Sequence, residues 1–233
     1  MATVAPEIPT TARDRRSLGL QLLLLLLASP IFFYGLGSYS IVNGDEAIYH
    51  YLARRMVESG DWFRLIFTGE ERVFDTFTHA PLYFWLKAVV IRVFGDSHWT
   101  MRLPSACLGV AGLLATFQLV AKLANLRAAF LAGLIQATTF QFVYLHSART
   151  GEMETGIALA FTLAALCFLR AVQDGRSFVP HHLCLIALIT FKSAIVVIPL
   201  LAETAYFAVH GASRARIRSW VTTALWIFPL GLL

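Results

Sequence analysis

The sequence predicts an all-α protein that crosses a membrane several times, a transmembrane helical bundle with two interfacial helices in its first extracytoplasmic loop. Hydrophobic residues make up 58% of the 233 residues and charged residues only 14%, whereas ordinary globular chains are about 45–50% apolar and about 25% charged. Apolar runs of membrane-spanning length recur, with short basic clusters between them. This composition excludes a disordered chain, and the presence of only three cysteines excludes a disulfide scaffold.

The polar N-terminus and the first apolar run set the starting orientation. Residues 1–17 carry three arginines and predict a cytoplasmic tail, and residues 18–39 predict the first span. A basic flank followed by leucines is also the pattern of a secretory signal peptide. Comparable runs follow, which favours a span, so 18–233 is predicted to form one domain integral to the inner membrane. Further spans are predicted at 104–121, 128–145 and 156–169, in 180–209 with a division at Lys192, and from 220 onward.

The segment 81–94 decides on which side of the membrane the later loops lie. It is apolar but short for a span. If it lies at the membrane surface, ten basic residues of the clusters between the spans fall on the cytoplasmic side, and the later turns on the opposite side keep only Arg149 and Lys192. Because this asymmetry obeys the positive-inside rule, we predict an interfacial helix there. The first outer loop, 40–103, and a second at 146–155 then face away from the cytoplasm. The net charge of +5 comes from short basic clusters between apolar runs, which fits the positive-inside bias better than a nucleic-acid partner.

Two adjacent acids, Asp45 and Glu46, open the first outer loop. Asn43 is the predicted N-cap of a helix that Gly60 ends. An apolar stripe at helical spacing follows, made of Ile48, Tyr51, Leu52 and Met56. Glu46 can complete a capping box, and Asp45 can compensate the helix dipole. Alternatively, Asp45 projects along the membrane-facing stripe, where an acid is costly without a task, and acts as a general base.

The predicted surface helix carries three basic side chains. His79 lies at its start and is either an exposed interface residue or a donor to an anionic headgroup, because phosphates bind readily at helix N-termini. Lys87 and Arg92 are expected to extend to the membrane interface while their stems lie along apolar surface.

Charged residues also occur in the second outer loop and beyond it. Arg149, Glu152 and Glu154 form either a solvated loop with local ion pairs or part of a site. Lys192 interrupts an apolar stretch, so it must reach the surface, pair with an acid or meet an anion. Glu203 needs a partner or water for the same reason. We therefore expect the polar residues of the outer loops to converge on one face.

Several segments together resemble the GT-C membrane glycosyltransferases, in particular the lipid A aminoarabinose transferases and the protein O-mannosyltransferase-like group. The first outer loop of that family is similar to two stretches, Gly44-Asp-Glu-Ala-Ile-Tyr49 and Met56-Val-Glu-Ser-Gly-Asp-Trp62. Four further segments follow in the family's order: His79-Ala-Pro-Leu-Tyr-Phe-Trp-Leu86, Arg102-Leu-Pro-Ser-Ala106, Ala148-Arg-Thr-Gly-Glu152 and Thr190-Phe-Lys192. No single segment is specific, but their order is, and the resemblance covers about residues 18–210.

The resemblance implies a reaction. Such enzymes pass a sugar from a polyprenyl-phosphate donor to an extracytoplasmic acceptor, with inversion at the anomeric carbon. Membrane lipids surround such an enzyme and are its further partners. By position, Asp45 matches the catalytic base and Glu154 the second acid. His79 matches a residue that meets the lipid phosphate, and Arg149 and Lys192 are expected to assist it. Glu46 and Glu152 are further candidate substrate-binding residues. The family also allows a divalent metal cation, for which the sequence indicates no clear ligand set.

The chain departs from the family pattern at three positions. Ala80 replaces a proline, Ser193 replaces a glycine, and Glu154 is one methylene longer than the usual aspartate. The sequence also stops inside an apolar run, which predicts a fragment or a shortened homologue. A transporter or lipid flippase is the first alternative, although acids gathered on one face are not typical of that class. A truncated, non-catalytic homologue is the second.

Overall fold

The computed structural model describes residues 10–41, 44–63, 81–211 and 213–227. Its described residues contain helices and no strand. The elements in chain order are α1 (Thr10–Phe33), α2 (Gly44–Ser59), α3 (Leu82–Phe94), α4 (His98–Leu123), α5 (Leu126–Thr138), α6 (Phe140–Tyr144), α7 (Glu154–Asp174), α8 (Val179–Phe191), the 3-10 helix η1 (Ser193–Val196), α9 (Val197–His210) and α10 (Arg214–Ile227).

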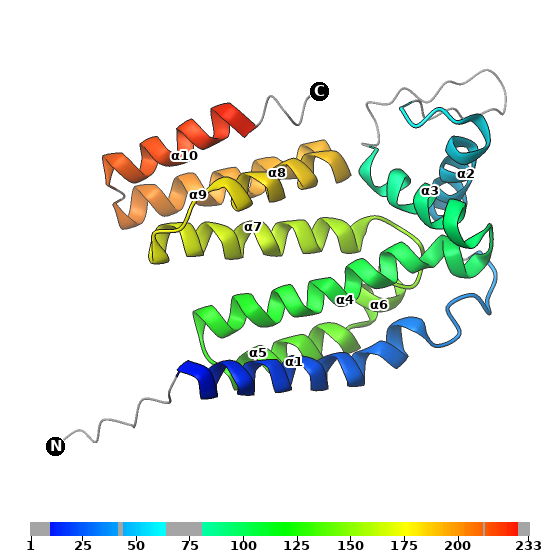
Figure 1. Ribbon diagram of the computed structural model, residues 1–233, viewed down its shortest axis with the longest axis horizontal. Coiled ribbons are helices and arrows are strands. Elements are labelled where there is room, and N and C mark those ends of the chain that lie inside the picture. Colours follow the sequence, from blue (N-terminus) through cyan, green and yellow to red (C-terminus); the bar gives the residue numbers. More distant parts are fainter. Residues whose placement is uncertain (1–9, 42–43, 64–80, 212, 228–233) are drawn as a thin grey trace.

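The long helices form a bundle, and two short helices pack at one end of it (Figure 1). α4 contacts α1, α5 and α7, and α7 contacts α8. α2 and α3 pack on each other, and α3 also packs on α4 and α8. We call this the α2–α3 end; the loops that follow α1 and precede α7 also lie there. The arrangement confirms the predicted all-α bundle with two helices in its first loop.

Three described helices are long and apolar enough to cross a membrane, namely Asp14–Phe33, His98–Leu123 and Glu154–Asp174. They correspond to the spans predicted at 18–39, 104–121 and 156–169, although α1 begins before residue 18 and ends at Phe33. Shorter apolar helices occupy Leu126–Thr138, Val179–Phe191 and Ala194–His210. The hydropathy pattern therefore located the apolar elements of the bundle better than it located their ends.

The predicted span at 128–145 is wrong as a single helix, because α5 ends at Thr138. Thr139 has φ −72° and ψ 118°, and the short α6 follows it. The hydroxyls of Thr138 and Thr139 donate to the carbonyls of Leu134 and Ile135, at 2.9 and 2.6 Å. Bonds from a threonine hydroxyl back to a carbonyl one turn earlier slightly destabilise and often bend a helix, which fits the break at this point. The division predicted at Lys192 is confirmed, since its backbone is extended between α8 and η1.

The apolar stripe of α2 faces the rest of the chain. Leu52 and Met56 are buried in one cluster with Tyr83 and Phe84 of α3 and with Phe191 of α8. The expectation that this stripe faces the membrane is therefore wrong at these positions. Asp45 does not share their environment either, because it is exposed at the start of α2. The helix ends as predicted, at Gly60, which has φ +74°.

Two glycines allow close packing of α1 on its neighbours. A Cβ atom on Gly133 of α5 would lie 2.5 Å from the Leu24 side chain, and one on Gly109 of α4 would lie 2.8 Å from the Phe32 ring. Leu24 and Phe32 are both fully buried. The glycines thus fix the position of α1, and with it the loop that α1 delivers to the α2–α3 end.

Candidate active site

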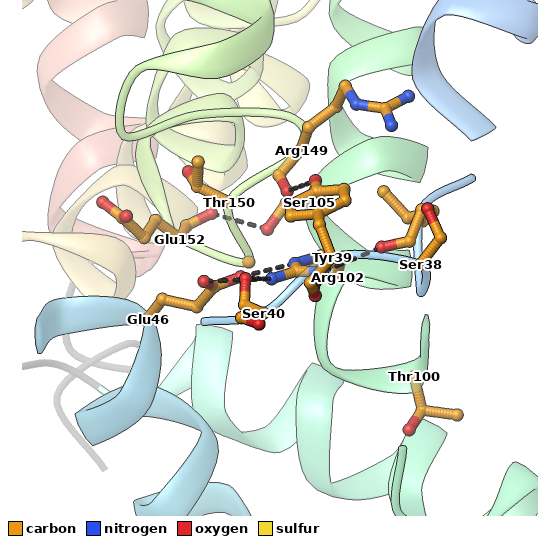
Figure 2. Close-up of polar contacts among 12 residues, drawn as sticks. Ser38, Tyr39, Ser40, Glu46, Thr100, Arg102, Ser105, Arg149, Thr150 and Glu152 are labelled. Carbon is orange, nitrogen blue, oxygen red and sulfur yellow. Dashed lines mark hydrogen bonds and ion pairs between the residues drawn. The ribbon is translucent and has the colours of Figure 1, made fainter. Parts of the chain in front are cut away.

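An ion pair joins Arg102 of α4 to Glu46 of α2 (Figure 2). α4 starts with a capping box in which Ser97 and Thr100 satisfy each other's backbone amides. Arg102 follows within the first turns of α4, and its Nε lies 2.6 Å from Oε1 of Glu46 while its Nη2 lies 3.2 Å from Oε2. Both side chains have an exposed fraction of 0%. Two-point contact of this kind is the strong form of an arginine–carboxylate pair.

Arg102 also holds the segment that joins α1 to α2. Its guanidinium donates to the backbone carbonyls of Leu36, Tyr39 and Ser40, at 2.8 to 3.0 Å, and lies 3.7 Å from the centre of the Tyr39 ring. The Glu46 carboxylate therefore stabilises the fold through its ion pair with Arg102. Its carboxylate is fully buried and not exposed to a substrate, and the capping box suggested for it involves Asn43, which lies outside the described residues.

Arg149 forms its side-chain hydrogen bonds with the C-terminal end of α1. Its guanidinium donates to the carbonyls of Ile31 and Tyr34, at 2.6 and 2.8 Å, and the Tyr39 hydroxyl donates to its backbone carbonyl. A cation at a helix C-terminus is favourable because it neutralises the carbonyl dipoles there. Figure 2 shows the side chain directed away from Glu46 and Glu152. The suggestion of a solvated loop residue is wrong for Arg149, which is buried.

Side chains of α3 and α4 hold the turn that precedes α7. Lys87 of α3 donates to the Gly151 carbonyl, with Nζ–O 3.0 Å. Ser105 of α4 donates to the Glu152 carbonyl, at 2.7 Å, and its hydroxyl lies 2.5 Å from that of Tyr83. Because the Ser105 proton is used on Glu152, Tyr83 is the donor of that second bond. Two successive peptide groups of the turn are thus fixed by buried side chains.

The expected extension of Lys87 to the interface is wrong. Lys87 is fully buried, whereas Arg92, on the same helix, is exposed. Burial lowers the pKa of Lys87 from its usual value to about 7, while Glu46 and Glu152 act in the opposite direction. A lysine in a short apolar helix has the same sequence pattern whether it points outward or inward.

Two carboxylates and one histidine form a cluster next to the buried side chains of Glu46, Lys87 and Arg102. Asp45 and His146 are exposed, Glu152 is buried, and their ligand atoms lie within 4.8 Å of one another. Nδ1 of His146 lies 2.6 Å from Oε2 of Glu152, and this contact raises the pKa of His146. One imidazole and two carboxylates are also a donor set that suits a divalent cation such as Mn²⁺ or Zn²⁺. The sequence indicated no ligand set for the divalent cation that the resemblance allows; these three residues are a set that fits one.

Glu154 and Lys192 belong to the same region. Glu154 begins α7, and its Oε2 is buried without a hydrogen-bond partner among the described residues. Lys192 is exposed at the break between α8 and η1 and interacts electrostatically with Glu154. Glu203, in contrast, lies elsewhere and contacts His181 and Trp220, at 3.1 Å each.

Four of the residues singled out in the sequence therefore come together, namely Asp45, Glu152, Glu154 and Lys192. His79 lies outside the described residues, as does Asn43. Sequence reasoning did not assign a role to His146 or Ser105. The only signal for His146 was its place in a short polar loop between apolar runs.

Comparison with known proteins gives the family. The model of the dolichyl-phosphate-mannose-protein mannosyltransferase family matches residues 78–227. "Putative mannosyltransferase YycA" of Bacillus subtilis is 28% identical over 156 residues, which are 66% of this chain and 22% of that protein. The undecaprenyl phosphate-alpha-4-amino-4-deoxy-L-arabinose arabinosyl transferase of Shewanella sediminis is 25% identical over 64% of this chain and 27% of its own length.

A solved structure shares the fold. The crystal structure of ArnT from Cupriavidus metallidurans bound to undecaprenyl phosphate superimposes with a TM-score of 0.76 at 21% identity, over 92% of this chain and 41% of that one. The chain thus spans about a quarter of the length of the two sequence relatives and less than half of the structural one. The family match extends over more than half of the sequence, and the chain therefore belongs to the dolichyl-phosphate-mannose-protein mannosyltransferase family of GT-C membrane proteins.

Proposed function

We propose that the protein transfers a sugar from a polyprenyl-phosphate donor to an extracytoplasmic acceptor, with inversion at the anomeric carbon. The observation that carries the proposal is the convergence of Asp45, His146 and Glu152, from two loops far apart in sequence, above a fully buried ion pair. The names of the relatives support the reaction class, since they describe transfer of mannose or of aminoarabinose carried on undecaprenyl phosphate.

Asp45 is the proposed general base. Its carboxylate is exposed at the start of α2, where an acceptor can approach. The acceptor hydroxyl oxygen attacks the anomeric carbon from the face opposite the phosphate, and its proton passes to Asp45. The bond between the anomeric carbon and the phosphate oxygen breaks, and the carrier phosphate leaves with the electron pair. Glu154 is the proposed second acid of the site.

Cationic side chains stabilise the leaving phosphate. Negative charge grows on that phosphate in the transition state, and preorganised cations in a partly dry site lower the barrier. Lys192 beside Glu154 and the imidazolium of His146 stand at the site for this role, and His79 remains a proposed contact. Alternatively, with His146 neutral, a divalent cation held by Asp45, His146 and Glu152 would supply the positive charge in place of the imidazolium. Arg149 is better suited to support than to binding, because its guanidinium is used on α1.

The membrane orientation is part of the proposal. With the N-terminus in the cytoplasm of a multi-pass inner-membrane protein, the α2–α3 end faces the other side, where the carrier-linked sugar and the acceptor meet. A reporter fused after residue 150 should then be extracytoplasmic, and one fused after residue 124 should be cytoplasmic. The reverse result would exclude the proposed site.

The decisive experiment compares wild-type protein with Asp45→Asn in proteoliposomes. The donors are undecaprenyl phosphate carrying mannose or aminoarabinose, and the readout is release of undecaprenyl phosphate, which records transfer to any acceptor. We expect Asp45→Asn to lose at least about 100-fold in kcat, the range that a general base contributes. Asp61→Asn, in the same outer loop but past the end of α2, is the matched control. Equal rates for Asp45→Asn and wild type would remove Asp45 from the mechanism.

A further inference from the structure

We propose that Lys87 is the positioning residue of this site, which holds the Gly151–Glu152 turn down on the Glu46–Arg102 ion pair and thereby sets Glu152 and His146 relative to Asp45. The catalytic meaning of this inference rests on the proposed function. The structural part stands on contacts of the buried layer alone.

Four charged side chains form that buried layer. Glu46, Lys87 and Arg102 have an exposed fraction of 0%, and Glu152 of 1%. Two acids and two bases therefore lie together where water does not reach, and the acids oppose the cost of burying Lys87 without cancelling it. An uncompensated charge at such depth is strongly destabilising, so each member depends on the others. Lys87 also lies 5.4 Å from the centre of the Tyr83 ring, which favours a cation.

Gly151 is the point where the turn meets the ion pair. Its φ of +64° belongs to the left-handed region that favours glycine. A Cβ atom there would lie 3.0 Å from the Met101 carbonyl oxygen and 3.4 Å from Oε1 of Glu46. The turn thus rests directly on Glu46, and the bond from Lys87 to the Gly151 carbonyl holds it in that position.

Glu152, the residue after Gly151, connects the Lys87–Gly151 hydrogen bond with the exposed part of the site. The Glu152 backbone is fixed by Ser105, and its carboxylate contacts His146, whose backbone has a φ of +53°. A displacement of the turn therefore moves Glu152 and His146 together, while Asp45 stays on α2. A displacement of about 1 Å in reacting groups can cost about 100-fold in rate.

Lys87 acts through the turn and not on the substrate. Its Nζ is enclosed by Gly151, by the Tyr83 ring and by the charges of Glu46 and Glu152. With no exposed surface it cannot touch a carrier phosphate or a sugar. Its replacement should accordingly change the rate of the chemical step more than the binding of the donor.

The test is hydrogen exchange of the full chain in detergent, followed in peptides that cover residues 146–155. Lys87→Met keeps the length of the side chain and removes its donor and charge. We expect at least about tenfold faster exchange of the turn amides, because a hydrogen bond to a charged group stabilises by that order. Arg92→Met, on the exposed side of the same helix, is the control and should not change the exchange. If Lys87→Met also leaves the exchange unchanged, the inference is wrong.

A second pair of variants applies if Lys87→Met does not fold. Lys87→Gln keeps a shorter donor and should show exchange between that of wild type and an unanchored turn, with Arg92→Gln as control. In the transfer assay, Lys87→Gln should lower kcat with little change in KM for the donor. A wild-type protein that releases no undecaprenyl phosphate would contradict the proposed function, while the exchange measurement would still decide the role of Lys87.

Discussion

Glu46 on α2 and Arg102 on α4 form a two-point ion pair with no exposed surface, and the same guanidinium binds three carbonyls of the segment that follows α1. The pair therefore connects the first loop of the chain to the start of α4. It also forms the floor on which the second loop rests at Gly151. The two loops that carry the candidate active site share this one support.

Removal of one partner from this pair should destabilise the protein severely. Glu46→Gln leaves the Arg102 charge buried without its counter-ion, which costs roughly 3–5 kcal/mol. The measurement is thermal unfolding in detergent, supplemented by the yield of folded protein. Glu58→Gln serves as control, because Glu58 pairs with Arg54 at an exposed position of α2, and we expect no measurable change there. Comparable unfolding of the two variants would contradict a supporting role for the buried pair.

Gly151→Ala tests the contact between the turn and its floor. The backbone has φ +64°, and the added Cβ atom would lie 3.0 Å from the Met101 carbonyl oxygen. We expect a loss of stability of about 1–3 kcal/mol, the range for a strained position, together with a loss of transfer activity. Gly175→Ala is matched, since Gly175 has φ +69° at the end of α7 and open space around it. The excess cost at Gly151 measures the contact; equal costs would show that only the backbone conformation matters.

Ser105→Ala should destabilise the protein more than Tyr83→Phe does. The Ser105 hydroxyl donates to the Glu152 carbonyl and accepts from Tyr83, so its removal takes a hydrogen bond from each of two buried polar groups. Each such loss costs about 1–3 kcal/mol. Tyr83→Phe removes the donor and leaves Ser105 bound to Glu152. Chemical or thermal unfolding of the two variants gives the order, and the opposite order would mean that the hydroxyl protons are arranged differently.

The helices could be predicted from local hydropathy, whereas the part of the site that could be predicted followed from the order and sidedness of the loops. Apolar length is a local property, so the spans that became α1, α4 and α7 could be found from hydropathy alone. The convergence of Asp45 and Glu152 followed from the sidedness of their loops. The use of Glu46 by Arg102 depends on packing between segments far apart in the chain, which no local pattern contains. The basic character of Arg149 likewise did not reveal that its partners are carbonyls of α1.

Lys87 should make stability rise with pH. Its pKa in the folded protein is lowered to about 7, mainly by burial, from an ordinary value of 10.5. Between these two values the unfolded chain binds more protons at this residue than the folded chain does, and stability then increases as pH rises. The contribution is smallest at and below pH 7, where the buried amine must carry its charge.

The measurement is the difference in unfolding temperature between wild type and Lys87→Met at pH 7, 8 and 9. Groups far from Lys87 titrate alike in both proteins, so the difference reports on the lysine and the charges beside it, and it should shift in favour of wild type as the pH is raised. Arg92→Met should show no such trend, because an exposed guanidinium does not titrate in this range. A difference that is constant across this range would mean that Glu46 and Glu152 compensate burial fully and keep Lys87 charged.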